Sequence, residues 1–245
     1  TTTIVLHIVD LESGKTLSVH ALENPQKFGG SDVIHRISYD RHHPGQLHRT
    51  ILSLLNDSLR TSGANRLSIF AVTVAGNPTM RDLFFDIDVQ SIGQKPYVSQ
   101  TQADMMAGRR DSTAIWSDGK TLGLSVHPKA RVYGLPLVSN HVGADMSAVL
   151  ATIPIHEYDK PFMVLDIGTN TEAAIGNRDR LICLSCPAGP AFEGGRLSCG
   201  MPACDGAIEA IRHDAGRWHP TTIGDARPRG FCGSGLVDLL AELYS

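Results

Sequence analysis

The sequence lacks several features that would assign it to a protein class directly. No apolar run approaches the ~20 residues needed to cross a bilayer, and residues 1–20 lack the basic, apolar and small-residue regions of a secretory signal. Basic residues are not in excess, since 22 Lys and Arg stand against 25 Asp and Glu, for a formal net charge of −3. Without a basic stripe, bulk electrostatics favours neither nucleic acid nor a membrane surface as a partner. We therefore expect a cytoplasmic protein.

Cysteine is absent from the first 182 residues. Five follow, at Cys183, Cys186, Cys199, Cys204 and Cys232. An odd number argues against a closed disulfide framework, but four thiolates could close a tetrahedral zinc site. The segment 180–186 (RLICLSC) alternates like a strand, however, which would send Cys183 and Cys186 to opposite faces. Small buried apolar side chains are the alternative interpretation.

Apolar patterning predicts an α/β fold over the first two thirds of the chain. The expected elements are a hairpin of 3–10 and 15–22, a helix at 46–62, a buried strand at 67–76, a helix at 77–85 and another at 144–153 that Pro154 ends. Residues 86–135 are polar and broken by proline and glycine, so we expect a connecting region with some short strands.

The remaining third begins with FMVLDIG (162–168), an apolar run that predicts a fully buried strand. A hairpin of 171–176 and 180–186 follows, and then a helix over 205–214 with Asp205 as its N-cap. The last element expected is a helix that starts in a glycine turn and places Leu236, Leu239, Leu240 and Leu243 on one face.

The segment LDIGTNTE (165–172) is echoed at the start of the chain. When Thr1, Thr2 and Thr3 are aligned with residues 169–171, a predicted hairpin follows each threonine-rich segment. The halves therefore resemble diverged copies, a first lobe at 1–155 and a second at 156–245. On this interpretation the first lobe lacks the strand that would precede Thr1, and the C-terminal part of the second lobe is missing.

An Asp at the end of a buried strand, followed by glycine and hydroxyl residues in a tight turn, suits a phosphate loop. Gly168 lets the backbone approach closely, the turn from Thr169 through Asn170 to Thr171 offers N–H and hydroxyl donors, and Asp166 can hold Mg²⁺ through water. A simple Asp-Gly turn at a strand end is the alternative. Asp145, at the start of a predicted helix, is a candidate base or magnesium partner, although capping explains such a residue equally well.

A second glycine-rich segment, GFCGSG (230–235), opens the last predicted helix. Exposed N–H groups at a helix start suit nucleotide atoms, so Gly233, Ser234 and Gly235 are candidates for the adenosine side. No strand precedes them with the spacing of a dinucleotide site, so that kind of site is not expected.

These motifs, in this order, resemble the superfamily of acetate kinase, sugar kinases, heat-shock chaperones and actin. Within it, the chain is most similar to the reductive activators of corrinoid-dependent enzymes. The residues that carry this resemblance are GGSDVIHRISY (29–39), VTVAGNPTM (72–80), HVGADMSAVLA (141–151), LDIGTNTE (165–172), SCPAGPAFEGGRLSCGM (185–201), GAIE (206–209) and GFCGSGLVDLLAEL (230–243).

The resemblance implies duplicated actin-like lobes, with ribonuclease H-like mixed sheets flanked by helices, that bind ATP and Mg²⁺ between them. It implies that ATP drives electron transfer from a [2Fe-2S] domain to an inactive Co(II) corrinoid. This chain has no cysteine cluster of the kind that would bind such an iron-sulfur centre. A corrinoid protein or a corrinoid-dependent methyltransferase is the expected partner, and a homodimer is compatible with these expectations. Two alternatives stay open: a small-molecule kinase of the same superfamily, and a non-enzymatic thiolate metal-binding or scaffold module.

Overall fold

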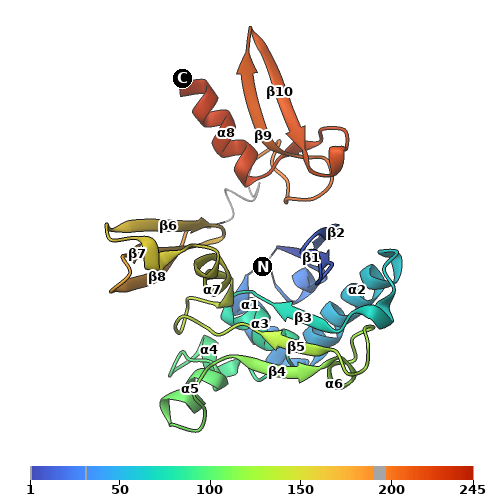
Figure 1. Ribbon diagram of the computed structural model, residues 1–245, viewed down its shortest axis with the longest axis vertical. Coiled ribbons are helices and arrows are strands. Elements are labelled where there is room, and N and C mark those ends of the chain that lie inside the picture. Colours follow the sequence, from blue (N-terminus) through green and yellow to red (C-terminus); the bar gives the residue numbers. More distant parts are fainter. Residues whose placement is uncertain (1, 31, 190–196, 245) are drawn as a thin grey trace.

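The computed structural model describes residues 2–30, 32–189 and 197–244 and shows an α/β protein with several small sheets (Figure 1). The strands are β1 (Thr3–Val9), β2 (Thr16–Glu23), β3 (Ala71–Val74), β4 (Ile115–Asp118), β5 (Arg131–Gly134), β6 (Phe162–Ile167), β7 (Asn170–Gly176), β8 (Leu181–Pro187), β9 (Ala207–Asp214), β10 (Arg217–Thr222) and β11 (Gly230–Phe231). The helices are α1 (Val33–His42), α2 (Gln46–Thr61), α3 (Pro78–Phe84), α4 (Gln90–Gly93), α5 (Gln100–Met106), α6 (Gly119–Leu122), α7 (Ala144–Ala151) and α8 (Gly233–Tyr244).

The first half is built around α2, the amphipathic helix that the leucine spacing predicts. Its buried residues Ile51 and Leu59 pack in one core with Ile8 of β1 and Val132 of β5. The hairpin β1–β2 forms as predicted, and β3, β5 and β4 form a mixed sheet in that order, with β5 parallel to β3 and antiparallel to β4. The predicted α/β class with mixed sheets flanked by helices is thus confirmed.

The apolar run at 67–76 is only partly a strand. A 3₁₀ turn at Arg66–Ser68 precedes β3, which covers Ala71–Val74 alone. Leu67 and Phe70 are more than half exposed, at 63% and 54%. The prediction of one long buried strand was therefore wrong: the Asn65 side chain accepts a hydrogen bond from the Leu67 N–H and nucleates a turn that hydrophobicity does not reveal.

Residues 86–135 hold more structure than the connecting region expected from their polarity. They contain α4, α5 and α6 as well as β5, the central strand of its sheet. A buried arginine organises them: Arg81 donates to the Thr113 carbonyl at 2.9 Å, the Leu135 carbonyl at 3.0 Å and the Thr101 hydroxyl at 2.9 Å. Hydrogen bonds to one arginine side chain produce no periodic spacing of apolar residues in the sequence. Hydrophobic periodicity therefore could not predict the helices and strands of this region.

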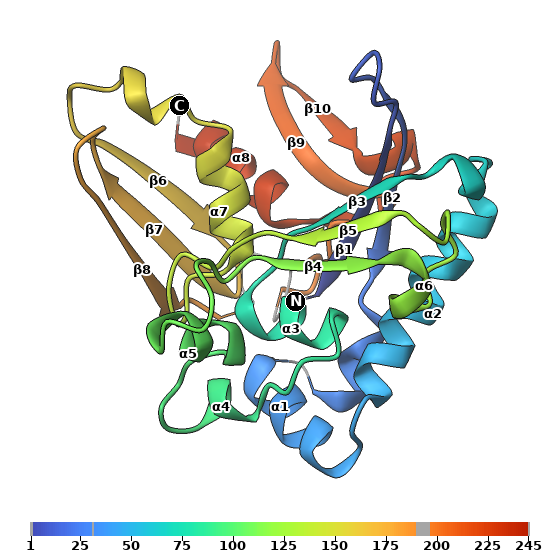
Figure 2. The same cartoon turned by 60° about the horizontal axis from the view of Figure 1, so that its bottom comes forward.

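Helix α7 joins the two halves of the chain. Its first turn is held by the β3–α3 loop, because the Gly76 carbonyl accepts from the N–H of Ala144 at 2.9 Å and of Asp145 at 3.3 Å. The apolar side of the helix packs on the antiparallel sheet β6–β7–β8, where Met146 contacts Ala174 in a small core. Figure 2 shows α7 between β3 and this sheet.

The opposite face of the β6–β7–β8 sheet is apolar and exposed. Exposed fractions of 47–61% are found for Met163, Leu165, Ile167, Ile175, Ile182 and Leu184. The prediction of a fully buried strand at 162–168 was therefore wrong in this respect, because only alternate side chains of β6 face α7.

Strand β9 (Ala207–Asp214) takes the place of the predicted helix at 205–214, so the helix with Asp205 as N-cap was wrong. Strand β9 pairs antiparallel with β10 across the two-residue turn Ala215-Gly216, where both residues have positive φ, 47° and 74°. Two left-handed central residues are typical of the hairpin turn that matches the strand twist. The Gly216 signal was present in the sequence but was outweighed by the apparent helical spacing of 205–214.

The last helix, α8, starts at Gly233 as predicted and packs along β9. The Asp238 carboxylate accepts from the Ile211 N–H at 3.3 Å, and the Glu242 carboxylate accepts from the His213 N–H at 2.9 Å. Of the four leucines predicted to share one face of this helix, Leu240 and Leu243 are exposed.

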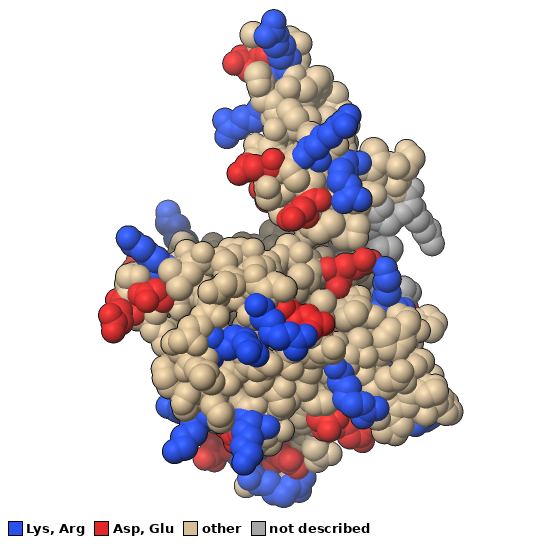
Figure 3. All heavy atoms as spheres, turned by 90° about the vertical axis from the view of Figure 1, so that its right-hand side faces the viewer, with Lys and Arg blue, Asp and Glu red and all other residues tan. Residues whose placement is uncertain are grey.

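Charged side chains of both signs are interspersed on the face shown in Figure 3. Within the described ranges, no helix is both long enough and apolar enough to cross a membrane.

Candidate functional site

The turn between β6 and β7, where the phosphate loop is predicted, is a tight two-residue turn. Only Gly168 and Thr169 separate the two strands, and the Gly168 N–H donates to the Asn170 carbonyl at 3.1 Å. On its far side the Thr169 carbonyl accepts from the N–H groups of Ala188 and Gly189 at 3.0 and 2.9 Å. The turn is therefore fixed by the segment that follows β8.

A row of polar side chains crosses the sheet beside this turn. Asp166 of β6 pairs in register with Glu172 of β7, which in turn pairs with Ser185 of β8. All three lie on the face that α7 covers. Asp166 and Glu172 are each two residues along their strand from the apolar residues Val164 and Ala174, which lie on the same face. The Ser185 hydroxyl donates to Glu172 Oε1 at 2.9 Å, and Glu172 is only 6% exposed.

Asp145 reaches the same region from the first turn of α7. Its Oδ1 accepts from the Met146 N–H at 2.9 Å. Burial raises the pKa of Asp145, the hydrogen bond from the Met146 N–H lowers it, and the negative charge of Asp166 raises it. Asp145 and Asp166 thus lie on α7 and β6, two elements that pack against each other.

Glu172 is the third acid of this cluster. Burial raises its pKa, the Ser185 hydrogen bond opposes that effect, and Asp145 and Asp166 add repulsion. We call Asp145, Asp166 and Glu172 the carboxylate cluster.

The threonines at the start of the chain lie at the beginning of β1. The Thr2 carbonyl accepts from the Asn24 N–H at 2.8 Å, and Thr3 pairs with Glu23, so both are tied to the end of β2. Thr1, the first of the predicted phosphate ligands, lies outside the described residues. The roles assigned to Thr2 and Thr3 stay predictions.

Two family models together match nearly the whole chain. Residues 1–158 match the RACo middle region, and residues 160–245 match the C-terminal domain of RACo, the ASKHA domain. The chain belongs to the RACo family. The predicted resemblance to reductive activators and the actin-like ATPase fold are thereby confirmed, and membership of the ASKHA class suggests nucleotide and Mg²⁺ binding.

Relatives of this RACo-family chain carry names that agree with that assignment. It is 34% identical to the corrinoid activation enzyme RamQ of Eubacterium limosum over 251 residues, covering 100% of this chain and 40% of that protein. It is 24% identical to the [Co(II) methylated amine-specific corrinoid protein] reductase of Methanosarcina barkeri, covering 86% of this chain and 39% of that protein. The solved structure of a reductive activator for corrinoid, iron-sulfur protein matches with a TM-score of 0.83 and 36% identity, over 99% of this chain and 38% of that one. The chain thus spans about 40% of the length of the curated relatives it matches.

The glycine-rich start of α8 lies in a different part of the fold from the Gly168-Thr169 turn. Figure 1 draws β9, β10 and α8 on one side of the β6–β7–β8 sheet, away from α7. A Cβ at Gly235 would lie 2.0 Å from the Ile208 carbonyl oxygen, so this glycine allows the helix to approach β9 closely. Ser234 is exposed, and the assignment of Gly233, Ser234 and Gly235 to the adenosine side stays a prediction.

The cysteines give no support to a zinc site. Cys183 and Cys186 lie on opposite faces of β8, as the alternation predicts, with Cys183 in the small α7 core and Cys186 exposed. Within the part of the chain that the structure describes, no three His, Cys, Asp or Glu side chains are placed so that they could hold a metal ion. The carboxylate cluster would thus need phosphate and water ligands beside its own, as Mg²⁺ sites commonly do.

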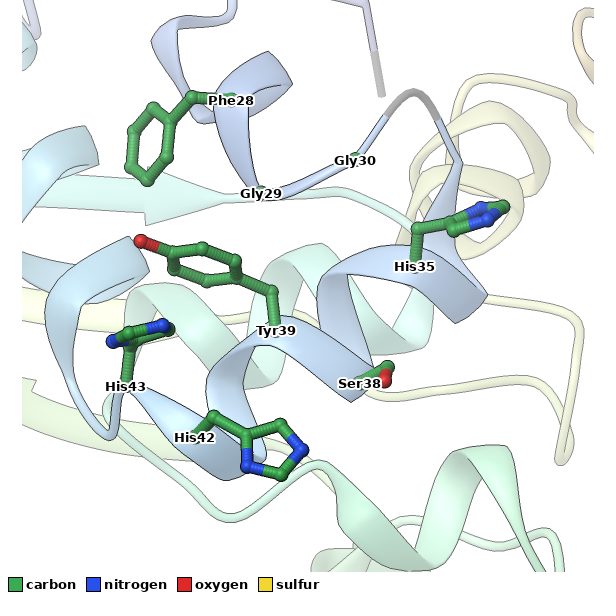
Figure 4. A pocket seen from close by; sticks show the side chains of 8 residues that line it. All are labelled: Phe28, Gly29, Gly30, His35, Ser38, Tyr39, His42 and His43. Atoms are coloured by element: carbon green, nitrogen blue, oxygen red, sulfur yellow. The ribbon is translucent and has the colours of Figure 1, made fainter.

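A pocket of about 450 Å³ lies elsewhere, over α1. Tyr39 lines it, and the Tyr39 ring stacks on His43 with centroids 4.4 Å apart and meets Phe28 edge-on with centroids 5.4 Å apart (Figure 4). His42 also lines it. These aromatic contacts explain the local packing, and none of the described residues that line the pocket is a carboxylate.

Glu172 is the residue that sequence reasoning missed. A carboxylate within an alternating strand is usually read as solvent-facing, and the cross-strand hydroxyl that holds Glu172 lies 13 residues away. The available signal was the period of two, because Glu172 shares its face with the buried Ala174.

Proposed function

We propose that this chain is the nucleotide-binding part of an ATP-driven reductive activator that restores Co(II) corrinoid proteins to their active state. Electrons would come from a [2Fe-2S] domain that these 245 residues do not include. The family assignment supports the class of protein, and the names of the relatives support the corrinoid protein as partner. The observation that supports the site is the carboxylate cluster beside the Gly168-Thr169 turn.

The chemistry of these residues fits Mg²⁺ and a nucleotide. Carboxylate oxygens are the ligands that Mg²⁺ prefers, and a bound cation would relieve the repulsion within the cluster. We assign magnesium binding to Asp166, and phosphate binding to Gly168, Thr169, Asn170 and Thr171. Magnesium supplies neutralisation of the charge on the phosphates.

Asp145 has a different proposed role. Burial raises its pKa, and a raised pKa suits a group that accepts a proton from the water that attacks the terminal phosphate. Its alternative role is that of a second magnesium partner. Either role places Asp145 in contact with the bound nucleotide or its metal.

Helix α7 offers a physical route from nucleotide to conformation. It carries Asp145, is bonded to Gly76 at its start, and donates from the Ser147 hydroxyl to the Pro136 carbonyl at 2.7 Å. Its other side lies on the β6–β7–β8 sheet. We propose that lobes at 1–155 and 156–245 move relative to each other through this helix when ATP binds or is hydrolysed.

Calorimetry tests the site. Mg-ATP binding should weaken at least about tenfold in Asp166→Asn, the change expected if the carboxylate contributes about 1.4 kcal/mol or more. Asp179→Asn is the matched control, because Asp179 lies in the other exposed turn of the same sheet. Equal affinity in the wild type and Asp166→Asn would overturn the assignment. The partner is tested by whether loss of the Co(II) absorbance of a corrinoid protein requires ATP; ATP-dependent formation of a phosphorylated metabolite would favour a kinase instead.

A further inference from the structure

On the basis of the proposed function, we propose that the chain binds its corrinoid protein through the exposed face of the β3–β5–β4 sheet, and that the partner presents an acidic surface to this face. The sheet is a different one from the sheet that carries the Gly168-Thr169 turn, so binding of the partner and binding of the nucleotide can be measured separately. Figure 2 shows β4 at the outer edge of this sheet.

An aromatic pair lies on this face. Trp116 of β4 pairs in register with Tyr133 of β5, and their ring centroids are 4.2 Å apart. The neighbouring strand β3 adds only the small, exposed side chains of Ala71 and Thr73, because its valines pack into the core on the other side of the sheet. The Trp116 side chain is therefore left 59% exposed, with a large apolar ring open to solvent.

Arg131 of β5 extends the aromatic pair. Its guanidinium lies over the Trp116 ring, 4.6 Å from the ring centroid, in a cation–π contact that fixes the charge at the surface. Asp118, opposite Arg131 on β4, accepts from the N–H and the hydroxyl of Thr121, both at 2.8 Å. Trp, Tyr and Arg are the residue types most enriched among those that dominate binding energy at protein interfaces, and here the three are in contact.

The charge around this face determines the kind of partner. The Lys120 N–H donates to the Pro128 carbonyl at 3.2 Å, which brings Lys120 and Lys129 to the end of the sheet where Arg131 lies. Both lysines are exposed. Residues 115–134 carry three basic side chains and one acidic one, Asp118, a local charge of +2 in a chain whose net charge is −3.

This local charge favours an acidic partner over a second copy of the same face. A symmetric dimer built on the face would place each positive patch against its own copy, and like charges across an interface are unfavourable. An acidic surface instead gives Arg131 a carboxylate partner and offers the Trp116 ring an apolar contact. Rim lysines such as Lys129 would then speed the encounter of the two proteins.

Calorimetry with the corrinoid protein of the same organism as titrant tests the assignment. Trp116→Ala should weaken binding at least about thirtyfold, equivalent to about 2 kcal/mol, as expected for a central interface residue. Arg131→Glu should weaken it at least as much, because it also replaces attraction by repulsion. Lys129→Gln should lower mainly the association rate and make that rate less sensitive to salt.

The matched controls lie on the β9–β10 hairpin. Trp218 is the second tryptophan of the chain, is 44% exposed, and also contacts an aromatic neighbour, since its ring centroid lies 4.6 Å from that of His213. Trp218→Ala and Arg217→Glu should leave the affinity for the corrinoid protein unchanged. Mg-ATP affinity should equal the wild-type value in Trp116→Ala, and circular dichroism confirms that each variant is folded.

Fluorine NMR provides a readout that needs no destabilised variant. The chain is labelled with fluorotryptophan, and its two signals are assigned with Trp116→Phe and Trp218→Phe. Addition of unlabelled corrinoid protein should shift the Trp116 signal and leave the Trp218 signal in place. A purely structural role of Trp116 would produce no such selective shift.

The outcomes separate the docking surface from the proposed function. If the wild type binds the corrinoid protein and Trp116→Ala binds it equally tightly, the docking surface is wrong while the proposed function stands. If the wild type does not bind the corrinoid protein, the proposed partner fails and the docking surface fails with it. If Trp116→Ala instead converts a dimer into a monomer in sedimentation, or abolishes binding of a single-stranded oligonucleotide, the face belongs to a second copy or to nucleic acid, and the assignment is overturned.

Discussion

Gly143 is where the joint between α7 and the β3–α3 loop is closest. A Cβ at this position would lie 2.6 Å from the Asn77 Cα and 2.8 Å from the Gly76 carbonyl oxygen. Backbone atoms cannot swing aside as a side-chain end can, so Gly143→Ala must push α7 away from the loop. Its φ of −84° is open to any residue, so the penalty comes from space alone. We expect a loss of about 1–3 kcal/mol in the free energy of unfolding, the usual cost of forced overpacking.

Gly76→Ala is the matched control in the same joint. Its nearest neighbour would be the Met80 Cβ at 3.8 Å, an ordinary contact, so its effect on stability should stay within about 0.5 kcal/mol. Urea denaturation followed by circular dichroism gives both values. Because Asp145 is two residues from Gly143, Mg-ATP affinity should fall in Gly143→Ala as well, by about tenfold for each 1.4 kcal/mol expressed in binding. Equal stability of the two variants would refute the tight joint.

Three further predictions concern the core, a buried charge and pH. Met146→Ala should cost about 2–5 kcal/mol because Met146 is fully buried against Ala174, whereas Met163→Ala, on the exposed face of the same sheet, should cost far less; thermal unfolding compares them. Arg81→Ala should cost about 3–5 kcal/mol because it leaves Asp82 buried without its partner, and a urea midpoint close to the wild-type value would contradict this. Burial raises the pKa of Asp145 and Glu172, so these carboxyl groups keep their protons to higher pH in the folded chain than in the unfolded chain. Their contribution to the stability of the fold is fully present below the pKa values of the unfolded chain. It is lost as the pH rises through the pKa values of the folded chain. The double variant Asp145→Asn, Glu172→Gln should therefore gain stability relative to the wild type as pH rises from about 5 to about 8, as measured by denaturation across that range.

Elements whose stability is mainly local could be predicted from the sequence. Helix α2 follows from its leucine spacing, and α3 from Asn77 and Pro78, since the Asn77 Oδ1 accepts from the Met80 N–H at 2.9 Å. Helix α1 gave no such signal, because its fully buried side chains are Arg36 and Ile37 and form no apolar stripe. The Arg36 guanidinium donates to the Gly30 carbonyl at 3.0 Å, a contact that only the folded chain creates.

The site shows the same division. Asp166 could be named from its place before a glycine turn, and Asp145 from its place at a helix start. The importance of Glu172 depends on strand register, because its neighbours Asp166 and Ser185 lie on the two adjacent strands. A pattern along one strand cannot reveal what two other strands bring to it.

The contact between α8 and β9 has a further consequence, which follows from a match of spacings. Asp238 and Glu242 are four residues apart, about 6 Å along a helix axis, and Ile211 and His213 are two residues apart, about 6.6 Å along a strand. The two spacings nearly coincide. The carboxylates of the helix can therefore accept hydrogen bonds from the strand N–H groups, as the backbone carbonyls of a neighbouring strand would. A shift of α8 by one residue along β9 would break both hydrogen bonds together. The two hydrogen bonds therefore fix the position of the helix along the strand. On this side β11 pairs only with Ala207 and Ile208, so an incoming strand could reach the rest of β9 only by displacing two charged acceptors, which protects it against association with other chains.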